Sequence, residues 1–351
     1  MEMYLNGIGC VAPQNTSEKP LFAEPLGETD VRRNIVKPNY KEYINPAMIR
    51  RMGTAIKMGV VASKQALSQA GTDMPDAIIA GTGLGCQQDS EKFLTAIIDH
   101  DEQFLTPTSF IQSTHNTVAG QVALMLKCRA YNFTYCHRGF SFENTLVDAA
   151  LALEEGWAQQ VLALGVDEMT THTLEVFQRI GLNVKDAEPT LDLLKSEQKG
   201  SVYGEGATAF VLSHQPSEHN FGRISAVKTL YKPTNEQQVL DWINSTLQES
   251  GASLNDIDLV LLGKNGNPEE NRWYEAVEAS ASTPSIGAFK HLVGEYHTAS
   301  AFALWLGASI LQDQEVPEVV FTRKNTTTDW NRILIYNQYD HRDHSLILLE
   351  K

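Results

Sequence analysis

The stretch of residues 106–168 constrains the fold more than any other part of the chain. Residues 130–136 are rich in aromatic and β-prone side chains, and they predict a strand that ends in a sharp turn at residues 137–139. Apolar residues then recur at helical spacing as far as Gly156, which is placed to end the helix. Residues 161–165 form a continuous apolar run, as expected for a strand buried on both faces. A strand, a tight turn, a buried helix and a second buried strand are how α/β enzymes present a nucleophile at a helix N-terminus.

Composition excludes several broad classes of protein. The 351 residues are 42% hydrophobic, which is enough for a full globular core. Lys and Arg number 28 against 43 Asp and Glu, and the net charge of −15 argues against binding to nucleic acid or to an anionic membrane. No apolar run approaches the roughly 18 residues that span a bilayer, and residues 1–13 lack the basic and apolar segments of a signal peptide. Cysteines without CxxC spacing favour reduced thiols, so we expect a compact soluble protein of the cytoplasm.

In the first half of the chain, a predicted helix over residues 49–69 stops before Gly71 and precedes a short buried strand over residues 77–80. This strand leads into a glycine run at residues 81–85. A nucleotide-binding function for the run is disfavoured. Cys86 occupies the third position of the dinucleotide fingerprint, and no acidic residue follows at the end of a second strand about 20 residues later. We therefore interpret the run as a tight turn and predict no cofactor site.

The same series returns after a polar stretch at residues 213–220. A helix over residues 236–250 is followed by Gly251 and by a buried strand over residues 254–262. The remaining elements predicted are a strand at 285–288, a buried helix at 298–311, a strand at 319–322 and a closing pair of strands at 333–336 and 346–349. A repeat of about 170 residues with buried strands predicts an α/β fold of two duplicated halves, residues 1–215 and 216–351, with helices between and outside the sheets.

Five segments of the chain, in the right order, resemble the β-ketoacyl-acyl-carrier-protein synthases, which have the thiolase fold. They correspond to the family's opening strand, its first long helix, the helix before the nucleophile, the GEGAG strand and the start of the last buried helix. In this chain they read NGIGCVAP, INPAMIRRMGTAIKMGVVASKQAL, NTVAGQVALML, YGEGATAFVL and FKHLVGEYHTASAFAL. The resemblance covers nearly the whole chain, and it implies the thiolase fold.

In active members of this family, a Cys at the turn takes the acyl group as a thioester, and two His assist decarboxylation and stabilise the developing oxyanion. Spacing places the Cys position at Gly139, 19 residues after Gly120 and 17 before Gly156. Aligning Cys136 with the family's Cys would need a three-residue gap on each side, with three residues added on one side and three removed on the other. Cys136 would then lie in the strand before the turn, and we interpret it as a buried structural thiol.

Both histidine positions are also replaced. The first His of the family follows a buried strand, and Gly263 stands there. The second His ends a Lys-x-x-x-Gly-His segment, in which Lys290 and Gly294 are kept but Glu295 replaces the His. The family's glycine-rich gating loop is replaced by residues 338–341, Gln-Tyr-Asp-His. The resemblance therefore implies that all three catalytic side chains and the gate are lost.

Other side chains remain candidates for chemistry. His115, His137 and His297 are alternatives as an acid or base for Cys136 in a changed geometry. His115 precedes a helix that in the family lines the dimer seam, so it is expected to face the pocket or the partner, or else to cap or pack that helix. Residues 340–344 contain two His and two Asp, but His side chains three apart on an extended strand point to opposite faces. We predict a polar turn there and no metal site.

Two functions compete on this evidence. The first is a non-condensing subunit that resembles the chain-length factors and pairs with an active ketosynthase in type II fatty-acid, polyketide or aryl-polyene biosynthesis. The second is an active condensing enzyme that uses Cys136 with a non-standard His. We favour the first, because losing the Cys, both His and the gate together is more simply a loss of condensation chemistry.

The resemblance implies an acyl carrier protein and an active ketosynthase as partners. Arg50, Arg51 and Lys57 form a basic cluster that in the family can meet the acidic carrier, although we favour a solvated helix face. In this fold the strand at residues 130–135 pairs with its twin, so we expect an obligate dimer through this strand and residues 106–125. It is expected to be a homodimer alone and a heterodimer beside an active synthase.

Overall fold

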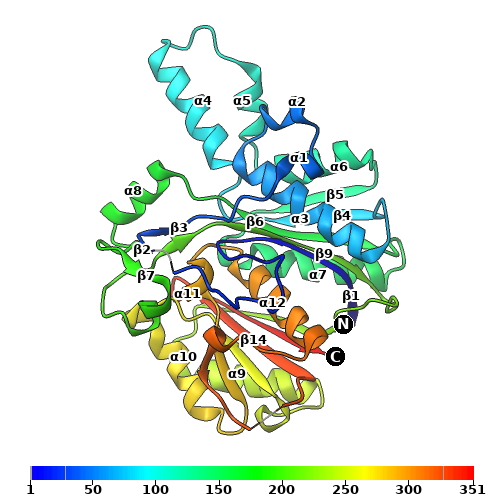
Figure 1. Ribbon diagram of the computed structural model, residues 1–351, viewed down its shortest axis with the longest axis vertical. Helices are drawn as coiled ribbons and strands as arrows, with labels where there is room; N and C mark the ends of the chain where they lie inside the picture. Colours follow the sequence, from blue (N-terminus) through cyan, green and yellow to red (C-terminus); the bar gives the residue numbers. More distant parts are fainter. Residues whose placement is uncertain (1, 28, 327) are drawn as a thin grey trace.

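The computed structural model describes residues 2–27, 29–326 and 328–351, which fold into sheets alternating with layers of helices (Figure 1). Hydrogen bonds link an 11-stranded series, but β1 and β10 join only through Met3–Ile224 and Tyr4–Arg223, so the series divides there into two sheets. The first sheet has the order β1 (Met3–Val11), β9 (Gly206–Ser213), β6 (Val161–Asp167), β4 (Ala77–Gly81) and β5 (Tyr131–Tyr135). The second has the order β10 (Arg223–Tyr231), β15 (Asp343–Glu350), β14 (Arg332–Tyr339), β11 (Leu259–Leu262), β12 (Ser285–Ala288) and β13 (Phe321–Arg323).

The two sheets repeat one plan. In the first, β4 runs parallel to β5 and β6, and in the second β11 runs parallel to β12 and β14. An antiparallel pair then leads to the junction in each case, β6–β9 and β14–β15. The α/β fold of two duplicated halves that we predicted is therefore confirmed. The division of the chain after residue 215 stays a prediction.

Helices cover the sheets on their outer faces and fill the space between them. On the outside, α3 (Thr54–Ala70) and α6 (Thr117–Leu126) lie over the first sheet, and α9 (Glu236–Glu249) and α10 (Pro268–Ser280) lie beside the second (Figure 1). Between the sheets, α7 (Ser141–Glu154) and α12 (Ala299–Asp313) contact strands of both. Every residue of 299–311 is buried, which is why that helix is apolar on all sides.

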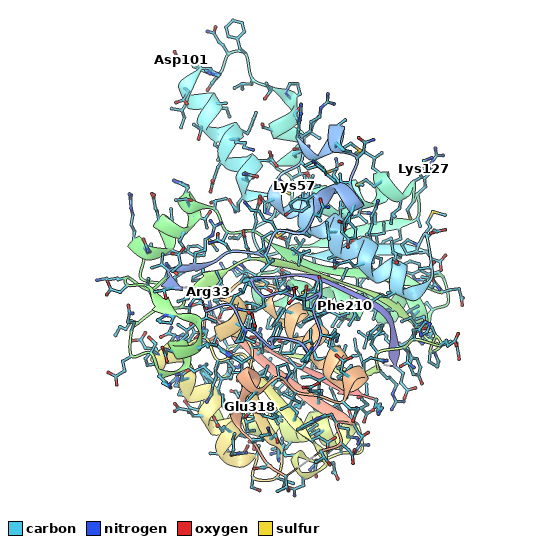
Figure 2. All side chains as sticks on the ribbon, in the orientation of Figure 1. Arg33, Lys57, Asp101, Lys127, Phe210 and Glu318 are labelled. Carbon is cyan, nitrogen blue, oxygen red and sulfur yellow. The ribbon has the colours of Figure 1, made fainter. Side chains whose placement is uncertain are left out.

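Two further helices form an arm that projects from the body. They are α4 (Gln87–Asp99) and α5 (Pro107–Gln112), and Asp101 lies at the outer end of the arm (Figure 2). The shorter helices are α1 (Tyr40–Tyr43), α2 (Pro46–Ile49), α8 (Thr171–Arg179) and α11 (Lys290–Val293), and the short strands are β2 (Thr29–Asp30), β3 (Arg32–Arg33), β7 (Glu188–Pro189) and β8 (Tyr203–Gly204). Within the described ranges, none of these helices is long and apolar enough to cross a membrane.

Several element boundaries differ from the sequence-based prediction. The helix expected over residues 49–69 begins only at Thr54, because the chain turns after α2 and Gly53 takes an extended conformation as N-cap. The strand expected over residues 254–262 begins at Leu259, because Ser253 and Asp256 form a capping box that nucleates a 3₁₀ turn. Strand β10 and helix α10 were not predicted.

Close approach of α3 to β1 depends on two glycines in the strand. A Cβ on Gly7 would lie 2.1 Å from the Ala66 carbonyl oxygen, and one on Gly9 would lie 2.1 Å from the Ala62 carbonyl oxygen. Gly27, by contrast, has no atom within 4 Å of such a Cβ. The helix can therefore rest on the backbone of β1 only where side chains are missing.

We predict that Gly7→Ala destabilises the protein by at least about 2 kcal/mol, because overpacking against helix backbone has no flexible neighbour to move. Gly27→Ala is the matched control and is expected to change the free energy of unfolding by less than about 0.5 kcal/mol. Urea unfolding followed by tryptophan fluorescence measures both. Equal stabilities of the two variants would show that α3 does not need this close contact.

Candidate functional site

The chain passes from β5 into α7 through a turn that contains Gly139. Arg138 has a left-handed backbone (φ 50°), and residues Arg138–Phe140 form a 3₁₀ turn that leads into the helix at Ser141. The Ser141 Oγ holds this turn, since it accepts from the His137 N–H and donates to the Arg138 carbonyl, both at 2.8 Å. Gly139 therefore lies at the helix entrance, where the partial positive charge of the N-terminus is greatest.

Gly139 has no room for a side chain. Its N–H donates to Asp343 Oδ2 over 3.2 Å, from the start of β15. A Cβ on Gly139 would lie 2.7 Å from Tyr339 Cβ and 3.0 Å from Asp343 Cβ. Carbon atoms do not tolerate such distances, so a cysteine fits here only if the β14–β15 hairpin moves.

Cys136, the alternative thiol, precedes the turn and is exposed, with its Sγ donating to the Gly83 carbonyl over 3.3 Å. Partial burial and then the negative charge of Asp167 raise the pKa of the Cys136 thiol, which keeps it protonated and weakly nucleophilic at neutral pH. Our interpretation of Cys136 as a buried structural thiol is wrong for the chain by itself. The reason is that β5 is the last strand of its sheet, so only β4 covers it.

The second candidate region is a buried ion pair. Lys290 Nζ lies 2.8 Å from Glu295 Oε2 and donates also to the Gln338 carbonyl over 2.9 Å. Lys290 is 0% exposed and Glu295 is 2% exposed, so neither charge is solvated. Lys290 belongs to α11 and Gln338 to the end of β14, so the pair ties the segment that replaces the family's second His to the hairpin.

Gly263, assigned to the first His position, cannot carry a side chain. A Cβ there would lie 2.4 Å from Asn337 Oδ1 and 2.7 Å from the Tyr274 hydroxyl. The side chain that reaches Glu295 is instead that of Asn265, whose Nδ2 lies 2.8 Å from Glu295 Oε2. Sequence reasoning missed Asn265, because a single polar residue in a loop carries no periodicity.

A second carboxylate completes this cluster. Glu270 Oε2 accepts from Asn265 Nδ2 over 2.8 Å and from Gln338 Nε2, and Glu270 Oε1 accepts from Asn267 Nδ2 over 3.2 Å. Three amides thus satisfy Glu270 without a cation. One lysine therefore faces two buried carboxylates, which favours the protonated form of one of them.

The pKa of Glu295 reflects this arrangement. Burial raises the pKa of Glu295 from 4.5 to about 7, Lys290 opposes the increase, and the negative charge of Glu270 adds to it. Glu295 is negative when ionised and neutral when protonated. In neither form can it supply the positive charge or the pair of N–H donors that a developing oxyanion needs. The cluster is therefore suited to holding loops together and not to stabilising an enolate.

His297, two residues after Glu295, is a packing residue. It is 6% exposed, and its ring lies 4.4 Å from that of Tyr339, centroid to centroid. Burial lowers the pKa of His297, although Asp167 opposes the decrease, so the ring is neutral. His297 and Cys136 both lie against Gly83, but in the described part of the chain no hydrogen bond joins them.

The other candidates lie apart. His115 is exposed and packs against Gly85, and His137 is exposed with its Nδ1 lying 3.0 Å from Asn144 Nδ2. Neither is bonded to Cys136. Arg50 and Arg51 are exposed, so the solvated face that we favoured agrees with the structure for these two residues.

Lys57 is only half-buried and lies over the Tyr40 ring, 5.4 Å from its centroid. Burial and then the charge of Lys37 lower the pKa of Lys57. Lys57 thus belongs to a set of neighbouring lysines beside α1 and α3.

Residues 340–344 form the turn between β14 and β15 and the start of β15. Among the described residues, no three His, Cys, Asp or Glu side chains are grouped so that they could hold a metal ion. The strands on either side are paired as far as Tyr339 and Asp343, so the loop that gates active members is a tight hairpin here.

Comparison with known proteins agrees with this architecture. The family model described as "Beta-ketoacyl synthase, N-terminal domain" matches residues 37–217. No curated sequence matches the chain.

Solved structures resemble the whole chain. The ishigamide ketosynthase/chain length factor matches with a TM-score of 0.81 and 16% identity over 100% of this chain and 99% of its own. A type II polyketide acyl-carrier protein in complex with its ketosynthase, AntDE:AntF, matches with a TM-score of 0.74 and 14% identity over 99% of both chains. The ketosynthase ApeO in complex with its chain length factor ApeC, from Xenorhabdus doucetiae, matches with a TM-score of 0.77 and 13% identity. The match covers 99% of this chain and 97% of the other. At these identities the likeness establishes the fold alone.

The raised pKa of Glu295 predicts a pH-dependent stability. Because the folded-state value of about 7 is above the ordinary 4.5, the stabilising contribution of the protonated group is complete below about pH 4.5 and is lost as pH rises through 7. Between pH 5 and 8 the wild type should lose up to about 3 kcal/mol relative to Glu295→Gln, whose oxygen can still accept from Lys290 and Asn265.

Urea unfolding of both proteins across this range tests the prediction. Burial raises the pKa of Glu168 to about 7 as well, but that residue is common to both proteins and cancels in the difference. Parallel stability curves for wild type and Glu295→Gln would contradict the assignment.

Proposed function

The chain belongs to the β-ketoacyl synthase family, and we propose that it is a non-condensing, chain-length-factor-like partner of an active ketosynthase in type II fatty-acid or polyketide biosynthesis. One observation supports the proposal most: of the three positions that the resemblance assigns to catalytic side chains, two have no room for a side chain and the third is held in a buried pair with Lys290. Asp343 and Tyr339 fill the space beside Gly139, Asn337 and Tyr274 fill the space beside Gly263, and Lys290 pairs with Glu295. A cavity of about 180 Å³ remains beside Glu295, but the Glu270 and Glu295 carboxyl groups that line it do not suit a developing negative charge.

The electrostatics also oppose condensation. Decarboxylation of a malonyl group builds negative charge on an enolate oxygen, which donors or cations must stabilise. Glu270 and Glu295 together outnumber the single cation Lys290 in the cluster. Lys290 already donates to Glu295 and to the Gln338 carbonyl, so it has little capacity left for a substrate.

The exposed edge of the first sheet supports a partner. The aromatic residues of β5 stack along one face, with ring centroids 6.1 Å apart for Tyr131 and Phe133 and 4.9 Å apart for Phe133 and Tyr135. Phe133 is 44% exposed, and Trp157, which packs against Tyr131, is 45% exposed. An unpaired edge strand with exposed aromatic rings is a site of association, so this edge is where the proposed partner joins.

A groove lies between α4 and α8 and has a volume of about 590 Å³. Its lining combines polar residues with the apolar side chains of Leu84, Leu94, Ile98, Val176 and Phe177. Leu84 is next to Gly83, whose carbonyl accepts from Cys136 at the end of β5, so the groove opens beside the proposed seam. A partner seated on β5 would enclose part of this groove, which supports a role in housing an apolar chain that the partner extends.

The partners that we propose are an active ketosynthase and its acyl carrier protein, in agreement with the complexes found among the structural neighbours. A carrier protein is acidic, and so is this chain, with a net charge of −15. Contact with the carrier is therefore favoured only at local basic surfaces, of which Arg50, Arg51 and Lys57 form one. A cytoplasmic location stays part of the proposal.

The alternative function, a condensing enzyme that uses Cys136, is favoured by the exposure of that thiol. We predict that acyl carrier protein thioesters or a cerulenin-like electrophile leave the purified protein unmodified, because the thiol is protonated and lacks a bonded base. Intact-protein mass spectrometry measures this. Stoichiometric labelling that disappears in Cys136→Ser would establish the alternative and overturn our proposal.

We predict that Phe133→Asp combined with Tyr135→Lys yields insoluble or monomeric protein of low stability, because the seam should be apolar and bury more than roughly 2,000 Å². The condensation activity of a co-expressed synthase should fall with it. Tyr231→Asp is the matched control, since Tyr231 is a 60% exposed aromatic residue on a different strand, β10.

Light scattering and co-purification measure this prediction. The control should remain dimeric and keep the synthase. A wild-type chain that is a stable monomer and retains no synthase would remove the main support for a partner subunit.

A further inference from the structure

The β14–β15 hairpin places a carboxylate against the entrance of α7. Asp343 is 6% exposed, and its Oδ2 accepts from the Gly139 N–H over 3.2 Å. The N–H groups of a helix entrance have no intrahelical partner and attract anions. Here the anion comes from the chain itself, 204 residues away in sequence.

The hairpin is built to hold Asp343 in this position. Asp340 (φ 52°) and His341 (φ 57°) are both left-handed, and the Arg342 N–H donates to the Tyr339 carbonyl over 3.2 Å, which is the geometry of a type I′ turn. The side chain of Gln338 braces the turn by accepting from the His341 N–H over 2.9 Å. Only three residues, Asp340–Arg342, connect the paired Tyr339 and Asp343, so Asp343 cannot swing away from α7 without breaking the ladder.

The surroundings of Asp343 suit a negative charge. His137, Arg138 and Arg342 lie close enough to lower its pKa, as does the Gly139 N–H. Burial is the larger effect and leaves the pKa of Asp343 above its usual value. These contacts therefore offset only part of the hydration free energy that the Asp343 carboxylate loses on burial.

We propose that Asp343 is an internal anion that permanently occupies the helix entrance at Gly139, so that the site is closed by an autoinhibitory contact and does not merely lack a cysteine. This inference deepens the proposed function, because it explains how the site of a non-condensing subunit is shut. Restoring a cysteine at residue 139 is then not sufficient to restore a reactive thiol. The Asp343 carboxylate competes for the same N–H, and its negative charge keeps a neighbouring thiol protonated.

Chemical rescue tests the contact in the protein as it exists. Asp343→Ala removes the carboxylate and should lower the Tm by roughly 2–6 °C. Acetate at pH 8 should restore at least about half of this loss, whereas chloride at equal ionic strength should not. Asp340→Ala is the matched control, since Asp340 is a carboxylate of the same hairpin, ion-paired with Arg342, with no contact to α7 recorded.

Two results would overturn the proposal. One is a Tm for Asp343→Ala equal to that of the wild type. The other is an acetate effect that is the same for Asp343→Ala and Asp340→Ala, or no greater than that of chloride. Neither experiment contains a synthase or a carrier protein, so failure of the proposed partnership leaves this result unaffected.

A thiol probe gives an independent measurement. In a Cys136→Ser background the remaining cysteines, Cys10, Cys86 and Cys128, are buried. Iodoacetamide at pH 7 should then alkylate Gly139→Cys/Asp343→Gly at least ten-fold faster than Gly139→Cys alone, because the double variant frees the N–H and removes the Asp343 side chain, while the contact with Tyr339 is common to both variants. Equal rates in two folded variants would contradict the proposal, and the acetate experiment stands if Gly139→Cys does not fold.

Discussion

A buried ion pair between Lys290 and Glu295 joins the parts of the molecule that surround the former catalytic region. Its amide partner Asn265 comes from the loop after β11, and the backbone of Glu295 pairs with residues 202–204 of the first half, through N–H···O bonds of 2.8 and 2.9 Å. Loops from both halves therefore meet at one residue. Removing Lys290 would leave two carboxyl groups, Glu270 and Glu295, buried without a cation, and removing one partner of a buried pair typically costs about 3–5 kcal/mol. The resemblance assigns the position of Glu295 to a catalytic His in condensing enzymes. In this chain Glu295 holds loops from both halves together.

The region between the two halves and the outer edge at β5 differ in what they can bind. In the region between the halves, the Lys290–Glu295 cluster and the Asp343–Gly139 contact occupy most of the space and leave a cavity of about 180 Å³. The outer edge at β5 stays open, with exposed rings and the groove between α4 and α8 beside it. Under the proposed function, the chain holds no acyl group at the helix entrance and instead shapes the space that a partner's product occupies. The proposed role, which is to shape a partner's product without condensing it, follows from the occupied positions at Gly139 and Glu295 and from the exposed rings of β5.

The sequence predicts the fold well because periodic, buried elements repeat in both halves. The assignment of Gly139 and Glu295 to catalytic positions stays a prediction, which rests on their fixed offsets from glycines and a lysine. The sequence does not predict the contacts that fill those positions. Asn265 reaches Glu295 across 30 residues and Asp343 reaches Gly139 across 204, and nothing local marks either one. β10 was missed because only part of it is buried, so its apolar pattern is weak. Cys136 was taken as buried because most free cysteines are, although the strand before it was expected to lie at an edge that pairs with a partner.

The central claim is that this subunit does not condense but completes an enzyme that does. The most direct measurement is release of CO₂ from malonyl carrier protein by the purified chain, by an active ketosynthase that co-purifies with it, and by the two together. The account predicts no release by this chain alone and full release, with product of defined length, only when both are present. Release by this chain alone that is abolished by Cys136→Ser would contradict it.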